Sequence, residues 1–307
     1  MNSPWMGTRR QFLARLATRL AAAGTFAATG SGVYALWDAK RPRVTRVETP
    51  LRHLPTSFDG LTVAFLTDTH HGPFVPVSYL EHVVALTNAL RPDLLLLGGD
   101  YVERSRGPRR RRGRRRTYIE PGIAALGGLR APLGRYAVLG NHDYLVDPEL
   151  TRRTLDEHGF IDLTNRGVWL ERGADRLRLA GVDDKRKGRP RLRTALGDMT
   201  GLDACLLFTH NPDYVERVRD RRVDLVLCGH THGGQVYLPG YGAPVTSSHY
   251  GQKYRAGLVQ GPRARVYVSR GIGTIGPPVR VCCPPEIVLL VLRASPDAPT
   301  RITEVSA

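Results

Sequence analysis

Five short apolar runs in this 307-residue chain are each followed, after one or two intervening residues, by Asp, Asn or His. Runs without polar alternation are typical of strands buried on both faces. In open α/β sheets the carboxyl ends of such strands line one crevice. We therefore expect an α/β fold in which the polar residues after the strands meet at one rim. They are Asp68 and His70 after residues 61–66, Asp100 after 94–97, Asn141 and His142 after 136–139, His210 after 204–208, and His230 and His232 after 223–228.

The densest of these motifs is Gly229-His230-Thr231-His232-Gly233-Gly234-Gln235. Side chains two apart on extended backbone point the same way, so both imidazoles could reach one small object. Imidazole is a favoured ligand of transition metals. Alternatively, the two histidines could be ordinary loop residues. Each of the other polar residues could likewise be a turn, cap or core residue without a role in binding. Because five such motifs lie at equivalent strand ends, we favour one common site over five unrelated roles.

Helices and further strands are predicted between and after these motifs. Helical periodicity marks residues 77–90, 119–129, 148–158 and 213–219, and shorter strands are expected at 169–170, 177–182, 264–269 and 287–292. Residues 183–193 are charged and typical of a loop. We expect a linker or edge strand over 41–60, one globular domain over 61–295 and a tail over 296–307.

The N-terminal segment resembles an export signal. Thr8-Arg9-Arg10-Gln11-Phe12-Leu13 is similar to the twin-arginine motif. The mildly apolar stretch Leu20–Trp37, about 18 residues, is at the lower limit for a membrane span. A basic amphipathic helix is the alternative. Residues 1–40 therefore predict a partner in the twin-arginine machinery and export across the cytoplasmic membrane. The protein would then be anchored on the outer side or be periplasmic or cell-wall associated.

Much of the net charge of +17 lies in one segment. Nine arginines occur from Arg104 to Arg116, and the rest of the chain carries +8. Such a run is typical of a solvated loop. The alternative is a cationic arm, with Arg109 as a substrate contact, that attracts anionic membrane lipid or a cell-wall phosphate polymer. Nucleic acid is not expected as a partner, because no aromatic residues alternate with the arginines.

The four cysteines have no metal-knuckle spacing and imply no disulfide framework. Cys205 and Cys228 lie within apolar runs and are expected to be buried free thiols. Cys282 and Cys283 are adjacent and cannot easily bridge to each other.

The ordered set D-x-H, G-D, G-N-H-D, H and G-H-x-H resembles the calcineurin-like metallophosphoesterase superfamily. The sequence is more similar to its exported branch, which carries G-H-T-H-G-G-Q after a twin-arginine signal. Ser269-Arg270-Gly271-Ile272-Gly273 and Pro284-Pro285-Glu286-Ile287 also look like that branch. The resemblance covers about residues 61–292. It implies a four-layer αββα sandwich with a dinuclear metal site at the carboxyl ends of the strands.

The resemblance also implies the roles of the site residues. Asp68, His70 and His232 look like ligands of a first metal, Asn141, His210 and His230 like ligands of a second, and Asp100 like a bridge. Nitrogen and oxygen donors without thiolate suit two divalent ions of Mn, Fe or Zn. His142 looks like the family's non-ligand catalytic histidine. His71 could touch substrate or be an ordinary rim residue, and Asp143 could orient a ligand or cap the next helix.

The expected activity is hydrolysis of a phosphate ester, either a diester or a monoester. A hydroxide bridging the metals would attack phosphorus, since cations lower the pKa of bound water. His142 would stabilise the transition state or protonate the leaving oxygen. Two alternatives stay open. One is a hydrolase of a UDP-sugar-lipid pyrophosphate with the same fold, and the other is a non-catalytic envelope-binding relative.

Overall fold

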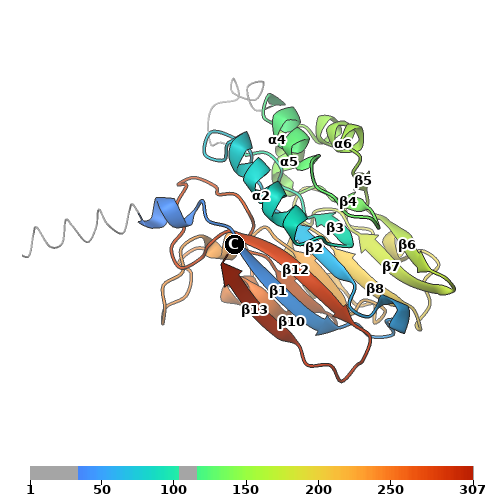
Figure 1. Cartoon of the computed structure of the whole chain (residues 1–307). Helices are drawn as coiled ribbons and strands as arrows, with labels where there is room; N and C mark the ends of the chain where they lie inside the picture. The colour runs from blue at the N-terminus through green and yellow to red at the C-terminus, as the bar shows by residue number, and fades with distance from the viewer. Residues whose placement is uncertain (1–33, 104–115, 307) are drawn as a thin grey trace, which may run out of the picture.

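A computed structural model describes residues 34–103 and 116–306. Within these residues two mixed β-sheets pack face to face (Figure 1). The first sheet has the order β13 (Arg301–Ser306), β1 (Arg43–Pro50), β12 (Glu286–Arg293), β2 (Thr62–Leu66), β3 (Leu94–Leu97), β4 (Arg135–Ala137) and β5 (Ile161–Asp162). The second has the order β10 (Gly257–Gln260), β11 (Arg265–Val268), β9 (Leu225–Cys228), β8 (Ala204–Phe208), β7 (Asp175–Gly181) and β6 (Arg166–Arg172).

Each sheet has a parallel centre. Strands β2, β3, β4 and β5 pair in parallel in the first sheet. Strands β7, β8, β9 and β11 do so in the second. Parallel strands bring their carboxyl ends to one edge, so the polar motifs that follow them meet there.

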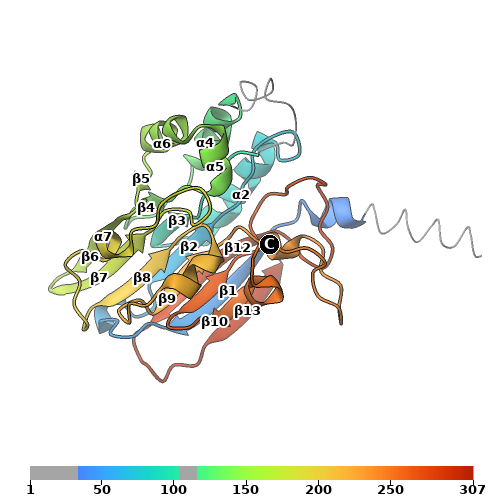
Figure 2. The same ribbon diagram turned by 180° about the vertical axis from the view of Figure 1, so that it is seen from behind.

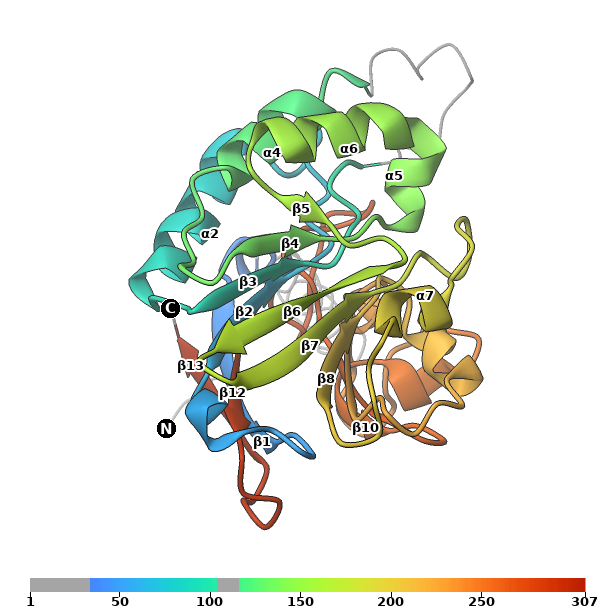
Figure 3. The same ribbon diagram turned by 90° about the vertical axis from the view of Figure 1, so that its right-hand side faces the viewer.

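Full α-helices cover the outer face of the first sheet (Figure 3). They are α2 (Val77–Ala89), α4 (Ile119–Leu126) and α6 (Pro148–Glu157), with the short α5 (Asn141–Val146) beside them. Helix α2 buries Leu80, Val83, Val84 and Thr87, a stripe with helical spacing. Helix α6 has Pro148 at its start, and the Asp147 side chain accepts a hydrogen bond from the Leu150 N–H.

The outer face of the second sheet has a thinner cover (Figure 2). It consists of α7 (Leu192–Leu196) and the 3₁₀ segments η3 (Pro212–Arg217) and η5 (Gly251–Tyr254), which bury Leu196, Val215 and Tyr254. The helix expected at 213–219 is thus a 3₁₀ helix, and α7 begins inside the segment expected to be loop. The four-layer α/β sandwich is confirmed, with unequal outer layers.

One of the hydrophobic cores lies between the two sheets. Phe65 and Leu96 from the first sheet pack with Leu206 and Leu227 from the second, all fully buried. These strands have apolar residues on both faces because helices or 3₁₀ turns cover the outer side. The core therefore fixes the relative position of the two strand edges that carry the polar motifs.

The first and last strands of the described residues belong to the first sheet. Strand β1 pairs in parallel with β12 and antiparallel with β13, so it is an interior strand and not an edge. Residues 301–306, expected to lie in a tail, form the edge strand β13. The unit that packs as one sandwich thus extends beyond the 61–295 range expected from the sequence.

Three features of the sequence lie wholly or mostly outside the described residues. They are the twin-arginine motif, the stretch Leu20–Trp37 apart from residues 34–37, and the arginine run up to residue 115. Arg116, at its end, pairs with Asp147 at 2.9 Å. Over residues 34–103 and 116–306 none of the helices has the length and hydrophobicity needed to span a bilayer. Cys205 and Cys228 are buried free thiols, as predicted.

Candidate functional site

The strand ends turn sharply where the polar motifs begin. Asp68, His70, Asp100, His230 and His232 all have positive φ, between 46° and 70°. Each non-glycine residue in this conformation costs about 1–3 kcal/mol, so the surrounding structure must impose it. The expectation that His230 and His232 lie on extended backbone and reach one point was wrong. Their turned backbone sends the two rings into neighbouring groups of side chains.

The first group joins Asp68, His70 and His232, all buried. The two Nε2 atoms of His70 and His232 lie 3.0 Å apart. Oδ1 of Asp68 lies 3.3 Å from Nε2 of His232 and 3.8 Å from Nε2 of His70. Strands β2 and β9, from opposite sheets, deliver these residues.

The second group joins Asp100, His210 and His230, also buried. Nε2 of His210 lies 3.0 Å from Nδ1 of His230 and 3.2 Å from Oδ2 of Asp100. The same Oδ2 atom is 3.6 Å from Nε2 of His70 in the first group. Asp100 therefore lies between the two groups, which is the position that a shared carboxylate requires.

The donor atoms fit divalent cations, one in each group. In both groups two imidazole nitrogens face each other at 3.0 Å beside a carboxylate oxygen. Oδ1 of Asp68 and Oδ1 of Asn141 are buried and accept no hydrogen bond from the described residues. Buried polar atoms are normally paired, and a cation would satisfy these lone pairs. Asn141 lines the same cavity as Asp100 and His230.

Two glycines allow this close packing. At Gly140 an added Cβ would collide with the Asp100 carboxylate, and at Gly229 it would collide with the Asp68 carboxylate. The Asp68 carboxylate accepts hydrogen bonds from the Thr67 hydroxyl at 2.8 Å and the His230 N–H at 2.9 Å. The glycines that precede Asn141 and His230 in their motifs are thus explained by the space that the acidic residues need.

The imidazoles of the two groups have different outer partners. Nδ1 of His70 lies 3.2 Å from Oε2 of Glu103, although the angle is poor for a hydrogen bond. Nδ1 of His210 donates to the Gly98 carbonyl at 3.0 Å. The Arg186 guanidinium donates to Nε2 of His230 at 3.2 Å. One group is therefore backed by a carboxylate and the other by a carbonyl and a cation.

Mutual charge sets the protonation preferences of these side chains. Burial disfavours the charged imidazoles, but Asp68 and Glu103 raise the pKa of His70 to about 10, and Asp100 raises the pKa of His210 to about 10. Burial and the charge of His210 lower the pKa of His230 to about 3. Burial opposes the ionised form of Asp100, yet the nearby histidines hold its pKa well below its usual range. The site thus stabilises two anionic carboxylates, which suits cation binding.

Asp143 orders the loops around Asp100. Its carboxylate accepts hydrogen bonds from the N–H groups of Asp100, Tyr101 and Gly140 at 2.8, 2.9 and 2.8 Å. Burial and the charge of Asp100 raise the pKa of Asp143 to about 7. Asp143 therefore orients the loop that carries Asp100, from a position within α5. The helix that follows, α6, is capped by Asp147 instead.

The two groups open into a cavity of about 980 Å³. His142 lines it, and its ring meets the His70 ring edge-on with centroids 4.6 Å apart. Arg186 and Lys187 reach the cavity from the loop after β7. The Asp184 carboxylate holds that loop by accepting hydrogen bonds from the N–H groups of both residues, at 2.9 and 2.7 Å. The cavity thus combines candidate cation ligands with fixed positive charge.

Sequence reasoning missed Glu103, Arg186 and Lys187. Glu103 lies three residues after Asp100, close enough to share its loop. Arg186 and Lys187 follow the strand expected at 177–182, so the strand-end rule that found the other motifs also applied to them. Their charged segment was read as an ordinary loop.

One expected substrate contact, His71, is not brought to the cavity. His71 is buried, its Nδ1 donates to the Val75 carbonyl at 2.8 Å, and its ring packs against Tyr118. It does not line the cavity. Arg109 lies outside the described residues.

The sequence matches one protein family and is similar to several of its known members. Residues 61–234 match the sequence model of the family described as calcineurin-like phosphoesterase. The chain is 29% identical over 292 residues to "Uncharacterized metallophosphoesterase YkuE" of Bacillus subtilis (strain 168), covering 94% of this chain and 98% of that one. It is 33% identical over 237 residues to "Phosphodiesterase YaeI" of Escherichia coli (strain K12), covering 75% and 81%.

Among solved structures, a 5'-nucleotidase precursor from Thermus thermophilus matches with a TM-score of 0.49 and 12% identity. The match covers 80% of this chain and 54% of that one. This likeness is too slight to bear on activity.

Proposed function

The chain belongs to the calcineurin-like phosphoesterase family and is a metal-dependent phosphohydrolase, and from that premise we propose that it hydrolyses a phosphodiester with two divalent ions. The observation that carries the proposal is the position of Asp100 between the two groups. Its Oδ2 atom lies 3.6 Å from Nε2 of His70 and 3.2 Å from Nε2 of His210. Similarity to the phosphodiesterase of Escherichia coli supports a diester over a monoester. A cavity of about 980 Å³ also has room for substituents on both sides of a phosphate.

We assign the ligands by group. Asp68, His70 and His232 would hold the first ion. His210 and His230, with Asn141, would hold the second, and Asp100 would contact both. Nitrogen and oxygen donors without thiolate suit Mn, Fe or Zn. Two such ions, when bound, lower the pKa of a water to make it a nucleophile and neutralise charge on the phosphate oxygens.

The protein's own side chains would do the remaining work. Arg186 and Lys187 would bind non-bridging phosphate oxygens and orient the ester, because both reach the cavity from a loop fixed by Asp184. Burial lowers the pKa of His142, so its ring is neutral near pH 7 and keeps one N–H. That N–H would donate a hydrogen bond to the leaving-group oxygen.

The test is hydrolysis of bis(p-nitrophenyl) phosphate beside p-nitrophenyl phosphate by the full chain. Purified protein is treated with chelator and then reloaded with Mn or Zn. We expect no turnover after chelation, recovery on reloading, and a higher kcat/KM for the diester. A faster monoester reaction would overturn the diester assignment. A protein that takes up metal and cleaves neither ester would favour the envelope-binding alternative.

We also propose export by the twin-arginine route and attraction of the Arg104–Arg116 segment to anionic lipid or cell-wall polymer. Its support is the Thr8–Leu13 motif and nine arginines in a segment that contains no acidic residue. Deleting residues 109–116 should weaken binding to anionic vesicles at low salt, with neutral vesicles as the control. Replacing Arg9 and Arg10 by Lys should keep the protein in the cytoplasm. Unchanged vesicle binding or unchanged export would contradict the respective proposal.

A further inference from the structure

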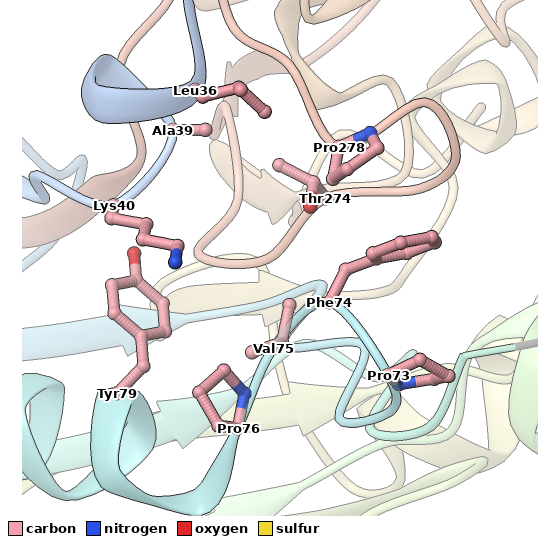
Figure 4. A pocket seen from close by; sticks show the side chains of 10 residues that line it. All are labelled: Leu36, Ala39, Lys40, Pro73, Phe74, Val75, Pro76, Tyr79, Thr274 and Pro278. Atoms are coloured by element: carbon pink, nitrogen blue, oxygen red, sulfur yellow. The ribbon is translucent and has the colours of Figure 1, made fainter. Parts of the chain in front are cut away.

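An apolar pocket of about 300 Å³ lies beside the catalytic cavity (Figure 4). In Figure 4, Leu36 and Ala39, from the start of the described chain, face Val75 and Pro76 across the pocket. Phe74 and Pro278 close one side. The polar groups at this pocket are few, so it suits a hydrocarbon and not a sugar or nucleotide base.

The pocket adjoins the catalytic cavity. Pro73 and Phe74 line both. Cε2 of the Phe74 ring would lie 3.9 Å from a Cβ placed on Gly276, a residue of the catalytic cavity wall. A molecule with its phosphate at the candidate metal ligands could therefore place an attached chain across Phe74 into the apolar pocket.

Both walls at this junction are fixed by hydrogen bonds. The turn that carries Phe74 is closed by reciprocal hydrogen bonds between Gly72 and Val75, both 3.3 Å. The opposite wall is held by Gln235, the last residue of the G-H-T-H-G-G-Q motif. Its side chain accepts from the Ile275 N–H at 2.7 Å and donates to the carbonyls of Ile275 and Pro277 at 3.0 and 3.2 Å. The pocket wall is thus tied directly to the segment that carries His230 and His232.

Positive charge lines the catalytic cavity and mostly apolar side chains line the neighbouring pocket, as a molecule with a phosphate and a hydrocarbon chain would require. Arg186 and Lys187 line the catalytic cavity, where an anionic phosphate would lie. The apolar pocket has one charged lining residue, Lys40. Leu36 and Phe74, at the pocket, are 50% and 49% exposed although apolar. These two side chains add exposed apolar surface at the pocket that an alkyl chain would cover.

We propose that the substrate is an amphiphilic phosphodiester and that one hydrocarbon chain of it occupies the pocket formed by Leu36, Phe74, Val75, Tyr79 and Pro278. This proposal rests on the proposed function, because that function places the phosphate at the candidate metal ligands. The occupant is the substrate's own chain, because the pocket adjoins the phosphate cavity and shares Phe74 with it.

The kinetic test uses p-nitrophenyl alkyl phosphodiesters with methyl, butyl and octyl groups, kept below their micelle concentrations. The full chain, loaded with metal, should show kcat/KM rising with chain length by up to about fourfold per buried methylene group. Leu36→Asp and Phe74→Ala should each reduce the octyl-to-methyl ratio at least fivefold. Leu202→Asp, at a residue 79% exposed outside the lining of both cavities, is the control and should keep the ratio.

A binding test is independent of turnover. Octylphosphonate and methylphosphonate share the anion, so calorimetry on the full chain isolates the contribution of the alkyl chain. Octylphosphonate should bind more tightly and with a more negative heat-capacity change, and Leu36→Asp should remove both differences.

The outcomes separate the two proposals. Equal hydrolysis of all three esters, with equal binding of both phosphonates, would overturn the hydrocarbon pocket and leave the phosphodiesterase proposal standing. Tighter binding of octylphosphonate without hydrolysis of any ester would support the pocket and overturn the proposed activity.

Discussion

The two halves of the candidate metal centre differ in what lies behind their histidines. In the half formed by Asp68, His70 and His232, the outer nitrogen of His70 faces the Glu103 carboxylate at 3.2 Å. In the half formed by Asp100, His210 and His230, the outer nitrogen of His230 instead meets the Arg186 guanidinium at 3.2 Å. A carboxylate behind an imidazole makes it a stronger ligand, and a cation behind it makes it weaker. We therefore expect the Glu103 half to bind its ion more tightly.

The Arg186 contact also depends on which ring nitrogen carries the proton. If Nδ1 of His230 holds an ion, Nε2 of that ring carries the hydrogen and cannot accept from Arg186. A guanidinium has no acceptor of its own, so Arg186 must then find another partner. The cavity offers one when a phosphate enters. In the half that binds its ion less tightly, ion binding thus frees Arg186 from His230 to contact the substrate phosphate.

Asp100→Asn should have the largest effect, because it removes the carboxylate that touches both halves. We expect loss of both ions and of activity on the order of 10³-fold or more. Metal content after gel filtration and kcat/KM for bis(p-nitrophenyl) phosphate measure the two losses. Asp198→Asn, at an exposed acidic residue, is the matched control. A variant that keeps both ions and full rate would show that the bridging assignment is wrong.

His142→Ala should act on turnover alone. Its ring stacks edge-on against His70 and lines the cavity, and a positioned imidazole contributes roughly 10²–10⁴-fold to such reactions. We expect kcat to fall in that range while both halves keep their ions. His82→Ala, on the exposed side of α2, serves as control. Loss of metal from the His142 variant would make it a ligand instead.

Glu103→Gln should weaken metal binding in the half that contains His70 and leave metal binding in the other half unchanged. Removal of a carboxylate behind a ligating histidine typically reduces metal affinity about 10–100-fold. A competition titration with a chromophoric chelator, which resolves tight and weak sites, should show that only the tighter site is affected. Equal weakening of both sites would remove the distinction between the halves.

Arg186→Met should have the smallest effect. We expect KM for the diester to rise about tenfold, as for loss of a charged hydrogen bond, with metal affinity unchanged or slightly higher. Steady-state kinetics at saturating metal gives the KM and kcat values. Arg189→Met, on the same loop but outside the cavity lining, should behave as wild type. A large fall in kcat with unchanged KM would place Arg186 in the chemical step.

The sequence predicted the elements whose apolar periodicity is strong. Strands β2, β3, β8, β9 and β12 were expected almost to the residue, because unbroken Leu, Val and Phe runs reflect burial on both faces. The seven candidate metal ligands were also expected at one rim, since parallel strands place their ends together. Helices α2, α4 and α6 were anticipated from their stripes and from Pro148.

What the sequence did not predict depends on tertiary contacts. The segment 213–219 has helical spacing, but Pro212 and the Asn211 side chain, which accepts from the Asp213 N–H at 3.0 Å, favour a 3₁₀ turn. The exposed, polar β13 has no apolar pattern and forms because β1 offers it a free edge. Glu103 and Arg186 were missed because their partners are distant in sequence.

The sheet order also has a consequence for biosynthesis. Val47 in β1 pairs with Leu290 in β12 on one side and Ile302 in β13 on the other. Strand β1 therefore lacks its neighbours in the sheet until residues 286–306 have been made. Contacts so distant in sequence form slowly and leave an unpaired strand open to aggregation meanwhile. We expect nascent chains that stop before β12 to need a chaperone.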